Sequence, residues 1–135
     1  MYRKILVPVA LEHGNDHKAA LDIARRLLAK GGEIVVLNVV EEVPSYIEQY
    51  LPRGQIEKNV TEARSLLQTE IGDAKGISVA VITGHAGNSI TGYAEENGID
   101  LIVIASHRPG LQDFFLGSTA ARVVRHAAAA VHVMR

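Results

Sequence analysis

The segment richest in chemical groups is residues 105–120, ASHRPGLQDFFLGSTA, which follows an apolar run and precedes a helical pattern. It closes with Gly117 and Ser118, and Thr119 lies beside them. Unpaired amides at a helix N-terminus favour an anion, a glycine permits close backbone approach, and the hydroxyls can donate to phosphate oxygens. The segment is therefore a candidate phosphate site. Spacing alone favours a simpler interpretation, in which Ser118 only caps its own helix.

The same segment contains adjacent Ser106 and His107, a pair that could suggest acyl transfer. Neighbouring residues on an extended segment point to opposite sides, which places them badly as nucleophile and base. We expect His107 to bond within the loop or to contact ribose or phosphate. A weaker hypothesis is a small hydrolase that uses His107 and Asp113. His13 and His17 flank a turn with no third ligand near in sequence, so a solvated helix entry is expected there and any metal ligand remains unknown.

Buried strands alternate with helical segments along the whole chain. Apolar, β-branched runs predict strands that are covered on both faces, and a period of 3.6 residues predicts helices. The predicted strands are residues 4–10, 33–40, 77–83, 100–105 and 130–135. The predicted helices are residues 15–32, 56–71, 88–98 and 117–128, with Gly31 and Gly32 as the stop of the first. Residues 41–55 are expected to form a long loop with partial order.

This alternation predicts one α/β domain over residues 1–135, with an open five-stranded parallel sheet and helices on both faces. Crossovers in such a sheet are right-handed. Ligands of such sheets bind beyond the carboxyl ends of the strands, where the strand order reverses. The candidate phosphate segment follows the fourth strand, so it is expected at that edge.

Composition narrows the function further. The 135 residues are 47% hydrophobic and 21% charged, which is ordinary for a globular protein. Aromatic residues make up only 4% and the net charge is −1, so neither a stacking platform nor a basic footprint for nucleic acid is expected. The chain has no cysteine, no apolar stretch long enough for a bilayer and no signal-peptide pattern. We therefore expect a soluble cytoplasmic protein that does not insert into membranes.

Three features together resemble the universal stress protein family: the opening KILVPV, the strand VLNVV, and residues 100–135. The resemblance covers the whole chain and implies a Rossmann-like fold of the adenine nucleotide alpha hydrolase-like type. In the nucleotide-binding branch of that family, a loop of Gly, two residues, Gly, nine residues and Gly-Ser or Gly-Thr wraps ATP phosphates and ribose. The resemblance therefore implies ATP with Mg as the ligand.

The loop departs from the family pattern at three points. Gly117 and Ser118 match the closing pair, but Ala105 and Arg108 stand where the first two glycines are expected. Only eight residues separate Arg108 from Gly117, so the loop is one residue short. Without these glycines, the loop backbone approaches a phosphate less closely. The guanidinium of an arginine, by contrast, adds several N–H donors that suit phosphate oxygens. The loop residues that the resemblance assigns to the nucleotide are Ala105, Ser106, His107, Arg108, Gly117, Ser118 and Thr119.

The resemblance also assigns an adenosine side. Pro8, Val9 and Ala10 match the end of the first strand, and Val39 matches the valine of the second strand. Ala10 stands where the family usually has Asp, which removes one acceptor for the nucleoside.

The implied function is a nucleotide-dependent regulatory module of the stress response. No general base or water-positioning group is evident, so any hydrolysis of ATP is expected to be slow. Ala10, Ala105 and the short loop favour the alternative, a dimeric protein-interaction module of the same fold that binds no nucleotide. The terminal strand AVHVM is apolar, and in this family the last strands of two subunits pair, so a homodimer through the C-terminal strand is expected.

Overall fold

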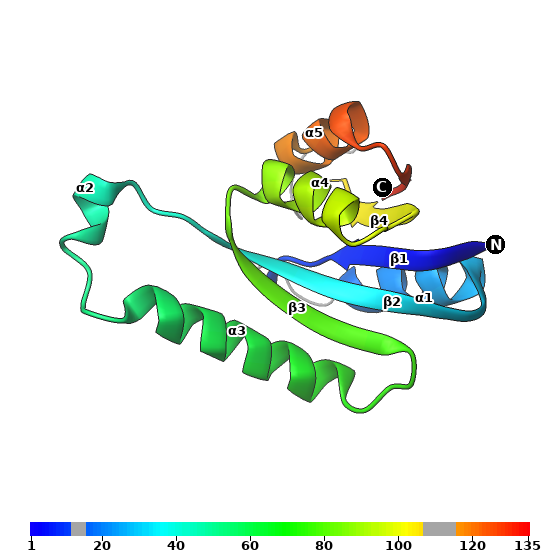
Figure 1. The fold of residues 1–135 in the computed structure, drawn as a ribbon, viewed down its shortest axis with the longest axis horizontal. Helices are drawn as coiled ribbons and strands as arrows, with labels where there is room; N and C mark the ends of the chain where they lie inside the picture. The colour runs from blue at the N-terminus through cyan, green and yellow to red at the C-terminus, as the bar shows by residue number, and fades with distance from the viewer. Residues whose placement is uncertain (12–15, 107–115) are drawn as a thin grey trace.

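A five-stranded parallel sheet forms the centre of the molecule (Figure 1). The computed structural model describes residues 1–11, 16–106 and 116–135. The strands are β1 (Tyr2–Pro8), β2 (Leu28–Glu41), β3 (Ile77–Gly84), β4 (Leu101–Ala105) and β5 (Ala130–Met134). Their order across the sheet is β3-β2-β1-β4-β5, and every neighbouring pair is parallel. The open five-stranded parallel sheet predicted from the sequence is confirmed.

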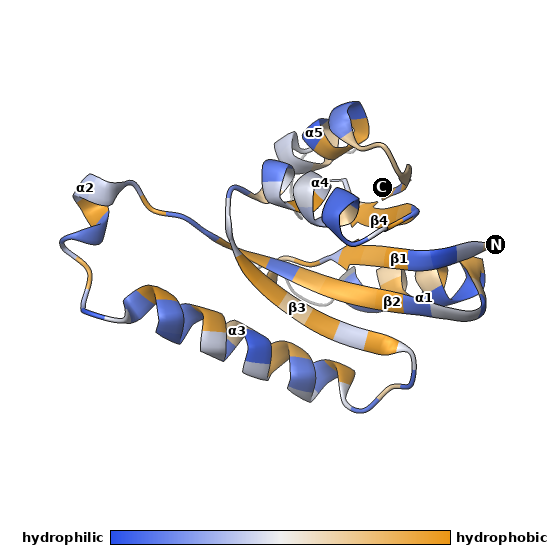
Figure 2. Cartoon of the chain, viewed as in Figure 1, coloured by the Kyte–Doolittle hydropathy of each residue, from blue (hydrophilic) through white to orange (hydrophobic). Residues whose placement is uncertain are grey.

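Helices cover both faces of this sheet, as predicted. They are α1 (Asp16–Leu27), α2 (Ser45–Glu48), α3 (Gln55–Ile71), α4 (Ala86–Glu96) and α5 (Ser118–His126). Ile5 and Val7 of β1 pack in the core with α1 and α3, and Leu6 between them packs with α4 and α5. Figure 2 shows the resulting apolar strands between amphipathic helices. Within the described residues, no helix is both long enough and apolar enough to cross a bilayer.

The end of the first helix differs from the prediction. The sequence predicted a helix as far as Gly32, but α1 ends at Leu27 and β2 begins at Leu28. Gly31 has a φ of +80°, and a Cβ on Gly32 would lie 2.7 Å from the carbonyl oxygen of Arg3. The two glycines thus allow β2 to pass close beside β1, and the prediction that they stop the helix was wrong.

The segment between β2 and α3 contains the short helix α2, where the sequence predicted a loop with partial order. It projects beyond the carboxyl end of β2, away from the rest of the sheet (Figure 1). Tyr46 and Tyr50 on this projection are 67% and 81% exposed. These two aromatic side chains therefore contribute little to the core.

Asp100 joins β1 to β4 just before β4 begins. The ladder between these strands has only two register pairs, Ile5 with Leu101 and Leu6 with Ile102. The Asp100 carboxylate extends it by accepting hydrogen bonds from the backbone N–H groups of Arg3 (2.9 Å) and Lys4 (3.0 Å). The Asp100 N–H also donates to the carbonyl of Lys4, at 3.0 Å. One residue thus supplies three bonds to the start of β1.

We predict that Asp100→Ala lowers the free energy of unfolding by about 2 kcal/mol, because two charge-assisted hydrogen bonds to backbone amides are lost. Urea denaturation measures this as a lower midpoint with an unchanged slope. Asp73→Ala, at an exposed aspartate, is the matched control and is expected to stay within about 0.5 kcal/mol of the parent. Equal stabilities of the two variants would contradict the role given to Asp100.

Candidate functional site

The strand order reverses between β1 and β4, and two of the predicted residues, Pro8 and Ala105, lie at the carboxyl ends of these strands. From β1 the chain moves outward to β2 and β3, and it then returns to place β4 on the other side of β1. The helices that follow β1 and β4 consequently lie on opposite faces, which opens a crevice at the carboxyl ends of these strands. Pro8 ends β1 and Ala105 ends β4, so the structure brings the two predicted segments to one edge of the sheet.

Val9 is fixed by two hydrogen bonds to β2. Its N–H donates to the carbonyl of Leu37 at 2.8 Å, and its carbonyl accepts a hydrogen bond from Nδ2 of Asn38 at 2.9 Å. Asn38 is 6% exposed and lies within an apolar strand. Sequence reasoning missed Asn38, although an asparagine inside the run IVVLNVV is a signal, because a buried amide needs a partner. Ala10 follows Val9 and is exposed.

Val39 lies two residues beyond the end of the ladder between β1 and β2, which ends where Pro8 pairs with Leu37. Along a strand, successive backbone groups point to alternate edges, so the N–H and carbonyl of Val39 face the same edge as those of Leu37. There the carbonyl of Leu37 is bonded to Val9, but β1 has ended before Val39, which among the described residues pairs only with Ile82 of β3 on its other side. The N–H and the carbonyl of Val39 thus lie side by side at the crevice, as a hydrogen-bond donor and an acceptor.

Ser106 connects the end of β4 to both β5 and α5. Its side chain is buried, with 2% exposed, and its N–H donates to the carbonyl of Met134 at 2.8 Å. Its carbonyl accepts a hydrogen bond from the N–H of Gly117. The two ends of the predicted phosphate segment are therefore held together, and Ala105 remains exposed at the end of β4.

Gly117, and not Ser118, is the N-cap residue of α5. Gly117 has an extended backbone with φ −60° and ψ 154°, and no side chain caps the helix. Ser118 is the first helical residue, so the interpretation that Ser118 caps its own helix is wrong. The first backbone bond of the helix runs from Ala121 N–H to the carbonyl of Gly117. The N–H groups of Ser118 and Thr119 thus have no acceptor among the described residues.

The remaining predicted loop residues, His107 and Arg108, lie outside the described residues, as do His13 and Asp113. His17 lies in α1, and its Nε2 is 3.0 Å from a carboxylate oxygen of Glu70 on α3, so this histidine links two helices. Within the part of the chain that the structure describes, no three His, Asp or Glu side chains form a group that could hold a metal ion.

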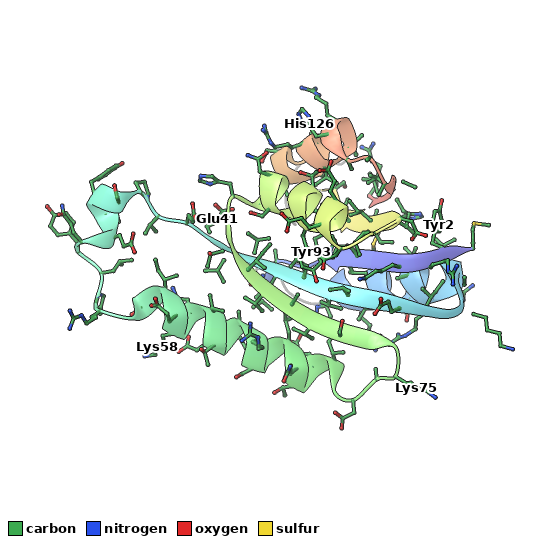
Figure 3. The ribbon with its side chains drawn as sticks, in the orientation of Figure 1. Tyr2, Glu41, Lys58, Lys75, Tyr93 and His126 are labelled. Atoms are coloured by element: carbon green, nitrogen blue, oxygen red, sulfur yellow. The ribbon has the colours of Figure 1, made fainter. Side chains whose placement is uncertain are left out.

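A hollow of about 400 Å³ lies beside the start of α5, between α4 and α5. Glu41, labelled at the end of β2 in Figure 3, is one of the residues that line it. Its carboxylate accepts a hydrogen bond from Ala86 N–H at 3.1 Å and lies 3.5 Å from Nδ1 of His85. Ser118 and Thr119 line the same hollow. The hollow is thus continuous with the predicted phosphate residues, a feature that the sequence did not reveal.

The family model of the universal stress protein family matches residues 1–135. The chain therefore belongs to this family, and the resemblance inferred from the sequence is confirmed. It is 31% identical to universal stress protein G of Salmonella typhimurium over 145 residues, an alignment that covers 100% of both chains.

Solved structures share the fold. The universal stress protein UspA from Lactobacillus plantarum has a TM-score of 0.76 and 23% sequence identity. The alignment covers 99% of this chain and 98% of that one. A universal stress protein crystallised in complex with cAMP has a TM-score of 0.67 and 17% identity over 99% of this chain and 97% of that one. These likenesses confirm the Rossmann-like α/β fold.

We predict that Asn38→Ala lowers the free energy of unfolding by about 1 to 3 kcal/mol, because it leaves the carbonyl of Val9 without its donor. Chemical denaturation measures the change. The same substitution at Asn59, whose side chain bonds only to Gln55 on the exposed face of α3, is the control and is expected to change stability by less than about 0.5 kcal/mol. If Asn38→Ala lowers the free energy of unfolding no more than Asn59→Ala does, the role given to the hydrogen bond between Asn38 and Val9 is contradicted.

Proposed function

We propose that the protein binds ATP, together with Mg²⁺, at the carboxyl ends of β1 and β4 and acts as a nucleotide-dependent regulatory module in the stress response. The observation that supports the proposal most is the uncapped start of α5, where the N-cap is Gly117 and no side chain caps the helix; the Val39 backbone beyond the end of β1 supports it further. The complex of a universal stress protein with cAMP supports an adenine nucleotide as the ligand class. The proposal places the protein in the cytoplasm, where ATP and Mg²⁺ are available.

The adenosine end would lie against β1 and β2. Adenine presents acceptor nitrogens beside an exocyclic amino donor, a pattern complementary to the N–H and carbonyl of Val39. Pro8 and Val9 supply an apolar wall that is fixed by Asn38. Ala10 contributes no polar group where the family usually has an aspartate, so the ribose loses one acceptor.

The phosphates would lie at the start of α5. The amides of Ser118 and Thr119 point along the positive end of the helix dipole, and both side chains add hydroxyl donors. Ala105, Ser106, His107 and Arg108 complete the loop that the family resemblance assigns to the nucleotide. Mg²⁺ keeps several waters and binds phosphate oxygens with few protein ligands, so we propose that it enters with the nucleotide and neutralises part of its charge. We expect hydrolysis to be slow at most.

We predict that the protein purified without added nucleotide releases ATP or ADP on denaturation, and that millimolar Mg-ATP raises its Tm. A ligand that binds only the native state at about 100 times its Kd stabilises it by about 2.7 kcal/mol, or several degrees in Tm. Gly117→Val is expected to abolish the increase in Tm, because the valine side chain would occupy the space through which phosphate reaches the backbone amides at the start of α5. Valine is compatible with the extended backbone at this position, so the variant is expected to fold.

Gly92→Val is the control for this experiment, since a Cβ at Gly92 meets no atom within 4 Å. It is expected to keep the full shift. A parent protein that carries no nucleotide and shows no shift with Mg-ATP would overturn the proposal. That result would favour the alternative, an interaction module without nucleotide, for which the exposed Tyr46 and Tyr50 on the projection around α2 supply a contact surface.

We further propose that two copies pair through β5. This strand lies at the edge of the sheet, and among the described residues its one strand neighbour is β4. Ala130 donates to the carbonyl of Asp100, and Met134 accepts from Ser106, so the backbone groups of residues 130, 132 and 134 face β4. Those of Val131 and Val133 consequently face the open edge. An apolar strand with such an edge is a template for a second strand.

We predict that Val133→Pro converts a dimer into a monomer, because it removes an outward N–H without removing a bond to β4. Val133→Ala loses the same side chain but keeps the N–H, and it is expected to remain dimeric. Sedimentation or light scattering distinguishes 14.6 kDa from twice that mass. A parent protein that sediments as a monomer, or a proline variant that remains a dimer, would refute pairing through this edge.

A further inference from the structure

Two arginines of α5 line the hollow between α4 and α5. Arg122 and Arg125 follow Ser118 by four and seven residues, a spacing that places the three side chains on one face of the helix. Neither arginine forms an ion pair with an acidic residue among the described residues. The hollow therefore has one wall with two positive charges, next to hydroxyl groups that belong to the proposed phosphate site.

Arg122 is held in place by α4. Gly87 is buried in the first turn of α4, and a Cβ built there would lie 2.7 Å from Cδ of Arg122 and 3.2 Å from its Cβ. The aliphatic stem of Arg122 thus lies across Gly87, where any larger residue would displace it. The Nε of Arg122 donates to Oδ1 of Asn88 at 2.6 Å. Stem and guanidinium are both positioned before any ligand arrives.

This arrangement leaves the outer part of the guanidinium available. The bond to Asn88 uses only the Nε donor, and neither Nη group has an acceptor among the described residues. A guanidinium with both Nη groups available makes paired hydrogen bonds to phosphate oxygens. Preorganisation reduces the side-chain entropy that such a contact costs on binding.

The acidic residue of the hollow, Glu41, already has partners at the start of α4. Both carboxylate oxygens of Glu41 face α4, one toward Ala86 N–H and the other toward His85. Figure 3 shows Glu41 beside the start of α4 and His126 on α5. The α5 wall therefore keeps its positive charge for an incoming anion.

We propose that this hollow receives the terminal phosphates of the bound nucleotide, and that Arg122 makes the site prefer nucleoside di- and triphosphates to AMP and adenosine. The inference rests on the proposed nucleotide function, since Ser118 and Thr119 connect the hollow to the phosphate site. In this arrangement, we expect adenosine and AMP, which lack the terminal phosphates, to make no contact with Arg122. Selectivity for a polyphosphate tail is thus assigned to a residue outside the glycine loop.

Titration calorimetry of the full chain with adenosine, AMP, ADP and ATP, each with Mg²⁺, tests this inference. The parent is expected to bind ATP at least about tenfold more tightly than AMP, because a charged hydrogen-bonded pair contributes about that factor. Arg122→Gln is expected to remove most of this preference and to leave adenosine affinity within about twofold. Gly87→Ala keeps every charge but displaces the Arg122 stem, and it is expected to act in the same direction.

Arg64→Gln, at an exposed arginine on α3, removes the same charge far from the hollow and is expected to behave as the parent. Thermal melting of each variant verifies folding. If the parent binds ATP and Arg122→Gln keeps the full preference over AMP, the inference is overturned while the nucleotide proposal stands. If the parent binds none of the four compounds, the nucleotide proposal itself fails and takes the inference with it.

Discussion

The short parallel pairing of β1 with β4 sets the position of everything that could bind a ligand. It joins the half of the sheet that contains β2 and β3 to the half that contains β5, through two register pairs and the backbone and side chain of Asp100. Because the carboxylate of Asp100 bonds to two consecutive amides of β1, it fixes the register of β4 against β1. The carboxyl ends of these strands, and the segments that follow them, consequently meet at one crevice.

The crevice is built mostly from backbone groups. β1 ends at Pro8 while β2 continues to Glu41, and this difference in length leaves the backbone of Val39 without a partner from β1 at that edge. At the other side, Ser106 holds Gly117 near the end of β4 and so places the start of α5. A site of this kind tolerates side-chain variation, which is compatible with the alanines at positions 10 and 105.

The packing of α4 against α5 adds charge to this backbone frame. Gly87 allows the stem of Arg122 to cross α4, and Asn88 accepts a hydrogen bond from Nε of this arginine. In the proposed site, Ala105 and Arg108 stand where the resemblance to the family expects glycines, which reduces the close backbone approach that we propose for phosphate. Cationic side chains offer a second route to the same anion, since a guanidinium reaches phosphate oxygens that a constrained backbone does not.

The sequence by itself predicted five parallel strands, four of the five helices, their place on both faces of the sheet and the family, because apolar periodicity and the closing Gly-Ser motif are local signals. It did not determine the end of α1 at Leu27, since Gly31 and Gly32 suit a helix stop as well as a strand that passes close to Arg3. Tertiary structure alone decided the contacts of Asn38 with Val9, Asp100 with Lys4 and Arg122 with Gly87. Each joins residues far apart in the chain, and only strand register and helix packing bring such partners within bonding distance.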